Sequence, residues 1–205
     1  MKDIIINKLI GIIKTKKKYN EKQIREIKYG LEGIYLTITK LGAIAILAAI
    51  LGIFKEMVIY ICLYNIIRIP SFGLHATKSW ICLLSSSILF IGIPFLCLYL
   101  NIPIVLKCII GSLCIIFMFK NSPADTKKRP IVNKKRRKVY KLISTFLTIV
   151  YLTFSIIIKN TFLSNCFLFS IIMQNFMISP MVYKFFKLPY NNYITFLKEH
   201  PDFIQ

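Results

Sequence analysis

A histidine and a cysteine seven residues apart are the side chains of this chain best suited to chemistry. His75 and Cys82 both lie in the stretch RIPSFGLHATKSWIC, residues 68–82, where the reactive groups of the sequence gather. An imidazole can take the proton of a thiol and later return it to a departing amine, and the thiolate is a strong nucleophile. The pair therefore indicates nucleophilic cysteine chemistry.

The spacing of this pair sets a condition on the local structure. In an uninterrupted helix, seven residues turn about two full circles and rise ~10.5 Å, so the two side chains share a face without touching. We expect either a helix that starts near Ala76, with His75 on the loop before it, or a gap that the substrate closes. Gly73 favours the loop because glycine tolerates unusual backbone angles. The alternative is that His75 caps an interfacial helix and Cys82 packs in the bilayer.

Other polar side chains could support the pair. Arg68, with Lys78 nearby, offers a guanidinium fork that can hold a carboxylate or an extension of a substrate. A snorkelling anchor at the membrane surface is the other interpretation of Arg68. Asp125 could orient His75, but we favour a turn or helix-cap role for this carboxylate.

The composition requires a membrane. Of the 205 residues, 56% are hydrophobic, and the 28 Lys and Arg against 8 Asp and Glu leave a net charge of +20. Soluble domains are nearer ~45–50% apolar. The basic residues cluster beside apolar runs, which indicates cytoplasmic segments facing anionic lipid and not a nucleic-acid site. We expect an all-α integral membrane protein with a single membrane domain over 1–205.

About six transmembrane helices are expected. The apolar runs are 33–54, 57–67, 79–100, 104–119, 142–158 and 162–182. The second run is only 11 residues long and ends at Pro70 and Gly73, so it is either a short crossing or a re-entrant segment. Lys40 and Lys107 lie near the starts of their runs, where snorkelling explains them more simply than a substrate path.

The remaining segments complete the organisation. Residues 1–30 form an amphipathic, basic N-terminus of interfacial helices without a signal peptide, and 33–119 hold the first four spans. The block 120–141 reads as a solvated basic loop that leads into a helix, 142–182 hold the last two spans, and 183–205 form a tail. Segments rich in Lys and Arg favour the cytoplasmic side, and an even number of membrane crossings separates the basic segments from one another. We therefore expect the cytoplasmic side to hold both termini, residues 68–78 and the 120–141 block.

The residues around the pair resemble a known family. The region resembles the corresponding part of the accessory gene regulator protein B family of bacterial quorum-sensing systems in three features: Arg68, the run SFGLHA at 71–76 and Cys82. The run SPAD at 122–125, followed by Lys127, Lys128 and Arg129, resembles the basic loop of that family. Phe72 stands where the family often has a glycine, a departure that concerns the geometry of the loop.

The resemblance implies a membrane-embedded cysteine endopeptidase in the bacterial cell membrane. His75 and Cys82 would be catalytic, and Arg68, Gly73, Lys78, Lys127, Lys128 and Arg129 would bind substrate or support the site. The substrate would be a short amphipathic precursor peptide with an acidic C-terminal tail, cut through a thioester acyl-enzyme and cyclised to a thiolactone or lactone.

The same resemblance implies a homodimer among membrane lipids. From the residues themselves we expect no metal or cofactor, since the cysteines lack CxxC pairs, and no nucleic acid. The competing class is a small-molecule or peptide transporter, and a third is a membrane scaffold with lipid-binding surfaces. The long runs contain no Asp or Glu and no inverted repeat is visible, which argues against a transporter. A neighbouring reading frame that encodes such a precursor would favour the peptidase over both.

Overall fold

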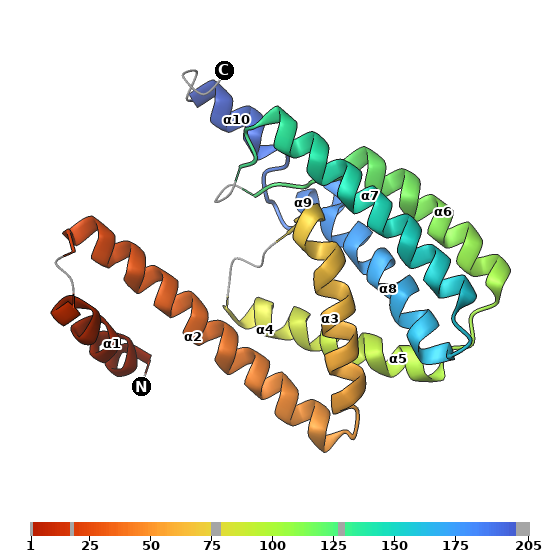
Figure 1. The fold of residues 1–205 in the computed structure, drawn as a ribbon, viewed down its shortest axis with the longest axis horizontal. Helices are drawn as coiled ribbons and strands as arrows, with labels where there is room; N and C mark the ends of the chain where they lie inside the picture. The colour runs from red at the N-terminus through yellow and green to blue at the C-terminus, as the bar shows by residue number, and fades with distance from the viewer. Residues whose placement is uncertain (1, 17–18, 75–78, 127–129, 200–205) are drawn as a thin grey trace. The chain divides into compact units, whose positions relative to one another are not determined.

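The computed structural model describes residues 2–16, 19–74, 79–126 and 130–199, and these are almost entirely helical. The chain divides into two compact units, 1–52 and 53–205. The first holds α1 (Lys2–Lys16) and α2 (Glu21–Ile50). The second holds α3 (Phe54–Ser71), α4 (Ser79–Ser87), the π-helical turn η1 (Ile88–Gly92), α5 (Ile93–Tyr99), α6 (Ile104–Asn121), α7 (Lys134–Ile157), α8 (Thr161–Ile178), α9 (Pro180–Phe185) and α10 (Asn192–Glu199) (Figure 1).

Five described helical stretches are long and apolar enough to cross a membrane. They are Gln23–Ile50, Trp80–Tyr99, Ile104–Asn121, Lys134–Ile157 and Thr161–Ile178. The all-α membrane fold is therefore confirmed, and five spans agree roughly with the six expected. That the two units form a single membrane domain stays a prediction.

The first unit corrects two expected boundaries. The second amphipathic helix of the N-terminus and the first span are one helix, α2, because Gly30 and Gly33 together cost only about 2 kcal/mol and do not end it. This helix ends at Ile50, before the expected Phe54, where Gly52 turns the chain at a φ of +71°. Lys55 and Glu56, between the first two apolar runs, lie in the first turn of α3.

The short second run is a continuous helix. Helix α3 has 18 residues, which at 1.5 Å each makes it about 27 Å long, close to the thickness of a bilayer core. It continues through Pro70 and ends one residue later, at Ser71. The run is thus a single helix without a re-entrant turn, although its charged residues, Lys55, Glu56 and Arg68, set it apart from the five apolar spans.

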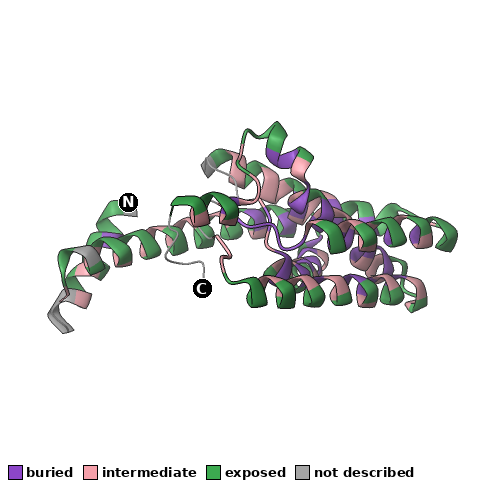
Figure 2. Ribbon diagram, turned by 90° about the horizontal axis from the view of Figure 1, so that it is seen from above, coloured by how far each residue is buried: buried purple, intermediate pink, exposed green. Residues whose placement is uncertain are grey.

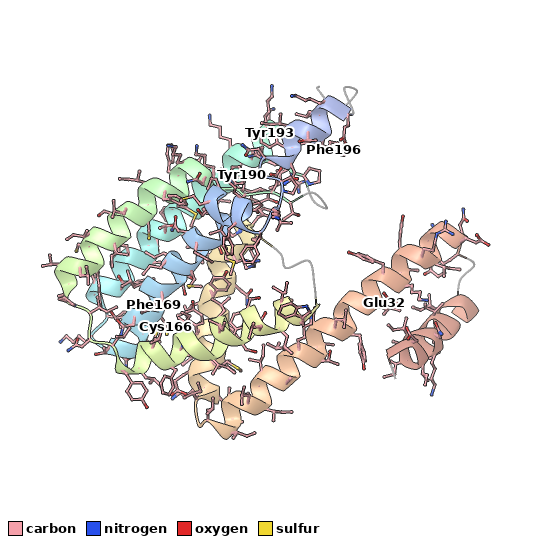
Figure 3. All side chains as sticks on the ribbon, turned by 180° about the vertical axis from the view of Figure 1, so that it is seen from behind. Glu32, Cys166, Phe169, Tyr190, Tyr193 and Phe196 are labelled. Atoms are coloured by element: carbon pink, nitrogen blue, oxygen red, sulfur yellow. The ribbon has the colours of Figure 1, made fainter. Side chains whose placement is uncertain are left out.

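The second unit is built around α8. Helices α6, α7 and α8 lie side by side, and α3 and α5 pack against α8 (Figure 1). The buried residues gather where these helices meet (Figure 2). One buried cluster includes Ile67, Met118, Ile178 and Tyr183. The other includes Tyr60, Tyr64, Cys97 and Cys166, with Phe169 packed against it (Figure 3).

Lys107 does not snorkel. The residue is only 6% exposed, and its Nζ donates to the Ser164 hydroxyl at 2.5 Å and to the Ser155 carbonyl at 3.5 Å. These acceptors belong to α8 and α7, so the ammonium links three helices. The snorkelling expectation was wrong because neighbouring helices supply oxygen acceptors inside the bundle.

The basic block 120–141 is not a solvated loop throughout. Lys120 and Asn121 still belong to α6, and α7 already begins at Lys134. Between these helices, residues 122–125 are buried. The helix of the last apolar run is also shorter than expected, since α8 ends at Ile178 and the short helix α9 starts at Pro180. Proline has no backbone N–H, so Pro180 cannot donate a hydrogen bond to the preceding turn.

Candidate active site

The four residues before His75, the 71–74 segment, are fixed by backbone hydrogen bonds. The Gly73 N–H donates to the Ala124 carbonyl at 2.9 Å, and the Ala124 N–H donates to the Ser71 carbonyl at 3.1 Å. The Leu74 N–H donates to the Met177 carbonyl at 3.0 Å, near the end of α8. The segment is thus held between the α6–α7 connection and α8.

Two side chains complete this clamp. Gln174 on α8 is fully buried, and its Nε2 donates to the Phe72 carbonyl at 2.8 Å. The Arg68 guanidinium donates to the Leu74 carbonyl at 2.8 Å and to the Tyr64 hydroxyl at 3.0 Å. Arg68 is therefore more than a snorkelling anchor, and with five N–H donors a guanidinium can hold this carbonyl and still bind a substrate.

The clamp imposes unusual backbone angles at two neighbouring residues. Phe72 has a φ of +58° and Gly73 a φ of +117°. An added Cβ on Gly73 would lie 3.0 Å from the Met177 carbonyl oxygen, so this site has no room for a side chain. At Phe72 a side chain is tolerated, and its ring packs edge-on against Tyr140 at 5.2 Å. A positive φ is easiest for glycine, which gives a physical reason for glycine at this position in the family.

Cys82 and Arg68 line the same pocket, which has a volume of about 310 Å³. Leu74, the residue directly before His75 in the sequence, lines it as well. The pocket therefore brings together two of the predicted site residues and the residue next to a third. His75 and Lys78 themselves lie outside the described residues.

The described part of α4 begins at Ser79, three residues before Cys82. The sequence placed the start nearer Ala76, a residue outside the described part. Cys82 is half-buried, and its carbonyl accepts a hydrogen bond from the Ser85 hydroxyl at 3.2 Å. By contrast, Cys97 and Cys166 are completely buried in the core. Cys82 is therefore the partly accessible thiol of these three, and it lies in the wall of the pocket.

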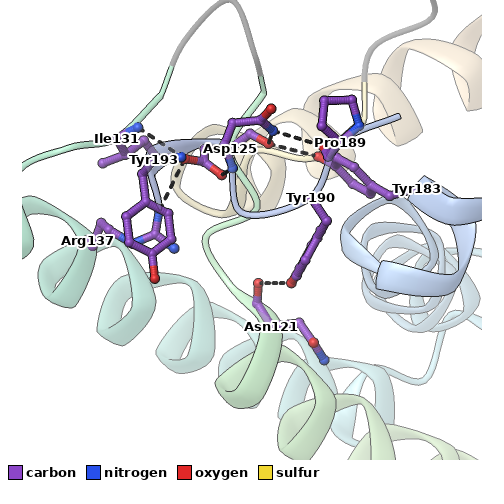
Figure 4. A network of polar contacts seen from close by, with 9 residues as sticks. Asn121, Asp125, Ile131, Arg137, Tyr183, Pro189, Tyr190 and Tyr193 are labelled. Atoms are coloured by element: carbon purple, nitrogen blue, oxygen red, sulfur yellow. Dashed lines mark hydrogen bonds and ion pairs between the residues drawn. The ribbon is translucent and has the colours of Figure 1, made fainter. Parts of the chain in front are cut away.

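Asp125 is the centre of a polar network beside the 71–74 segment (Figure 4). Its carboxylate is 1% exposed and accepts from the backbone N–H groups of Asn192 at 3.1 Å, Tyr193 at 2.9 Å and Ile131 at 3.3 Å. It also forms an ion pair with Arg137 at 3.3 Å. Asn192 and Tyr193 begin α10, so Asp125 caps that helix from a distant part of the chain, in agreement with the favoured cap role.

Aromatic side chains surround this carboxylate. The Arg137 guanidinium lies over the Tyr193 ring at 3.6 Å, and the Tyr183 hydroxyl donates to the Asp125 carbonyl at 3.4 Å. Tyr190 lies on the chain that leads into α10, and Tyr193 lies in the first turn of that helix (Figure 3). Burial raises the pKa of Tyr183, and the nearby Asp125 charge raises it further; burial also raises the pKa of Tyr190. Both phenols therefore stay neutral hydrogen-bond donors at physiological pH.

Replacing Asp125 with alanine should destabilise the fold strongly. The change removes the acceptor of three backbone donors and leaves the Arg137 charge without its partner, which typically costs about 3–5 kcal/mol. We expect a clear fall in the melting temperature of the detergent-solubilised protein. Glu21→Ala is the matched control, because the Glu21–Arg25 pair is exposed, and it should change little. Equal melting temperatures for the two variants would show that the polar network centred on Asp125 does not stabilise the fold.

The sequence did not single out Gln174. Gln174 could have been noticed because it is a polar residue inside the apolar run 162–182, where such residues usually mark a structural or functional contact. Lys127, Lys128 and Arg129 lie outside the described residues, although Asp125 and Ile131 on either side of them are joined by a hydrogen bond. The described residues contain no group of three His, Cys, Asp or Glu that could hold a metal ion.

The fold and the pocket define the class of protein: an all-helical membrane protein with a half-buried cysteine in a pocket at one end of its helices. The chain belongs to the accessory gene regulator B family, whose sequence profile matches residues 6–178. The family is part of the accessory gene regulator quorum-sensing systems.

Three relatives illustrate this similarity. An AgrB-like protein of Listeria monocytogenes is 30% identical over 195 residues, covering 94% of this chain and 92% of the relative. An AgrB-like protein of Clostridium acetobutylicum is 27% identical over 202 residues, covering 95% of each chain. The accessory gene regulator protein B of Staphylococcus carnosus is 30% identical over 137 residues, covering 67% of this chain and 71% of the relative. No solved structure matches the chain.

Proposed function

We propose that this protein is a membrane-embedded cysteine endopeptidase that cleaves and cyclises a quorum-sensing precursor peptide. The observation that supports it most directly is the pocket shared by Cys82, Arg68 and Leu74 in a member of this family. His75 takes the proton of the Cys82 thiol, and Sγ attacks the carbonyl carbon of the scissile bond. The C–N bond then breaks, the departing amine receives the proton from His75, and a thioester joins the peptide to Cys82.

Cyclisation follows from the chemistry of the thioester. This bond keeps the carbonyl activated, so a cysteine or serine within the bound peptide can attack it. The attack transfers the acyl group to the internal side chain, closes a thiolactone or lactone ring and returns the Cys82 thiol. The second step is therefore an acyl transfer within the substrate and consumes no water.

The supporting residues have separate roles in this proposal. The clamp made by Arg68, Gly73 and Gln174 fixes the segment that leads into His75. Lys78 and the basic residues 127–129 attract the acidic tail of the precursor, because opposite charges steer the tail toward these side chains. The enzyme works as a homodimer among membrane lipids. A neighbouring reading frame without an acidic tail would argue against the proposed substrate.

A precursor whose ring-forming cysteine is replaced by alanine should trap the acyl-enzyme. It can still be cut, but it lacks the group that releases the thioester. We expect an adduct on Cys82 that has the mass of the N-terminal part of the precursor and is sensitive to hydroxylamine. His75→Ala should give neither product nor adduct. Rapid release of linear peptide without an adduct would show a hydrolase and exclude the cyclisation step.

We further propose that this site faces the cytoplasm of a multi-pass protein in the bacterial cell membrane, with both termini on the same side. The basic block around α7 supports this orientation, since Lys and Arg favour the cytoplasmic side. Lys135→Cys should react with a membrane-impermeant maleimide only after permeabilisation, whereas Lys159→Cys, at the other end of α7, should react in intact cells. Labelling of Lys135→Cys from outside would reverse the orientation.

A further inference from the structure

The pocket beside Cys82 continues along one face of the helix that carries the cysteine. Cys82, Ser85, Ser86 and Leu89 all line it, at the spacing of residues on one helical face. From Cys82 to Leu89 the rise is about 10 Å. The far end lies in the π-helical turn η1, where Leu89 and Phe90 line the pocket. The pocket therefore extends from the thiol along the candidate membrane span Trp80–Tyr99 as far as Phe90.

The walls of this pocket are mostly apolar. Leu74, Phe176, Met177 and Phe186 face it from other parts of the fold, and Arg68 is the only charged side chain among the described lining residues. An apolar group that leaves water for such a lining gains about 25 cal/mol per Å² of buried surface. A lysine side chain would instead meet the charge of Arg68 and lose its hydration.

The size of the pocket limits what it can hold. A volume of about 310 Å³ is at the low end of ligand pockets, so the pocket has room for a large side chain but not for a long stretch of peptide. Ser85 and Ser86 contribute small side chains to the wall next to Cys82. Larger residues at these two positions would fill the space.

We propose that this pocket binds the side chain of the substrate residue whose carbonyl Cys82 attacks, and that it selects a large apolar side chain there. We call this substrate residue the acyl residue; the inference rests on the endopeptidase function proposed above. In the thioester, the side chain of the acyl residue is only a few bonds from Sγ, so it must occupy space next to Cys82. It stays there through cleavage and cyclisation, whereas the residue after the scissile bond departs in the first step.

The test compares precursors with Phe, Ala, Asp or Lys as the acyl residue. The full-length protein in lipid vesicles is mixed with each precursor, and the rate of acylation of Cys82 is followed by intact mass. The unmodified protein should prefer Phe to Ala by about tenfold or more and react slowest with Asp and Lys, since small changes in an apolar pocket are worth ~10–200-fold. A preference for Asp would show that Arg68 selects a carboxylate and would overturn the proposal.

Ser86→Leu tests the wall directly. It should slow acylation by the Phe precursor at least about tenfold. The acylation rate with the Ala precursor should stay within about threefold of that of the unmodified protein, because a methyl side chain does not need the space that the new leucine occupies. Ser87→Leu is the matched control, since Ser87 is next in the helix and is not a lining residue, and it should leave both rates unchanged. Equal slowing of both precursors by Ser86→Leu, or selectivity set by the residue after the scissile bond, would overturn the proposal.

A second measurement does not depend on peptide processing. In benzyl and methyl methanethiosulfonate, the cysteine sulfur attacks the sulfur that carries the benzyl or methyl group. A mixed disulfide forms, the bond between this sulfur and the sulfonyl group breaks, and methanesulfinate and the thiol proton are released. Peptide mass mapping should show a benzyl preference at Cys82 about tenfold above that at the exposed Cys62, and Ser86→Leu should remove it. If Cys82 forms no acyl adduct with any precursor but shows this preference, the proposed function fails and the apolar pocket remains. If adducts form without any side-chain preference, only the pocket proposal fails.

Discussion

Replacing Cys82 with alanine should abolish cleavage of the precursor, with a loss of more than about a thousandfold, because no other described residue that lines the pocket has a thiol to form the thioester. The same change should leave the fold intact, since the half-buried thiol makes few contacts that alanine cannot replace. Cleavage is measured by mass spectrometry of the peptide products in membranes that contain equal amounts of each variant.

The other five cysteines provide the controls for this experiment. Cys62→Ala changes an exposed thiol on α3, and Cys166→Ala changes a completely buried one on α8. Neither lines the pocket, so both variants should process the precursor at near-normal rates, as should the corresponding changes at Cys97, Cys108 and Cys114. Cleavage by the Cys82→Ala protein, or its loss in Cys62→Ala, would show that the nucleophile is wrongly assigned.

Gly73→Ala should reduce processing by about tenfold or more. The residue has a φ of +117°, and an added Cβ would lie 3.0 Å from the Met177 carbonyl oxygen and 3.3 Å from its carbonyl carbon. Unfavourable backbone angles of this kind cost about 1–3 kcal/mol, and backbone atoms cannot easily move aside. The 71–74 segment must therefore shift, which displaces the chain just before His75. Initial cleavage rates at saturating precursor measure the effect.

Gly92→Ala is the control for the loss of a glycine. It lies in η1, where an added Cβ would meet only the Ile88 side chain, at 3.9 Å. This variant should process the precursor normally. A small alkylating reagent should still modify Cys82 in the Gly73→Ala protein, because the pocket remains accessible. Normal processing by Gly73→Ala would mean that the clamp does not position the catalytic segment.

The reactive residue types of the candidate site were visible in the sequence, but most of the contacts around them were not. Arg68 and Cys82 could be grouped because they are close in the chain and of reactive types. Gln174 could not be linked to Phe72, which lies 102 residues earlier, since a buried amide carries no sign of its partner. The cap of α10 by Asp125 was equally hidden, because its donors at Asn192 and Tyr193 are backbone N–H groups that every residue except proline has.

The helices were predicted better than their ends. Apolar runs identified the membrane helices, because a bilayer demands about 20 apolar residues for each span. The ends depend on local breakers such as Gly52 and Pro180, which the sequence analysis did not use. The burial of residues 122–125 came from pairing with the 71–74 segment, and the burial of Lys107 came from acceptors on two other helices. Both are tertiary contacts without a local pattern.

The long sequence separation within the clamp also sets the order in which the site can be assembled on the ribosome. Gln174 is synthesised 102 residues after Phe72, and Asn192 is synthesised 67 residues after Asp125. At ~5–20 residues per second, these intervals last roughly 3–20 seconds. During this time the Cys82 helix already exists, while the Phe72 carbonyl and the Asp125 carboxylate still lack their later donors. Cys82 is therefore synthesised before the residues that fix the 71–74 segment, and completion of the candidate site is a late step of biosynthesis.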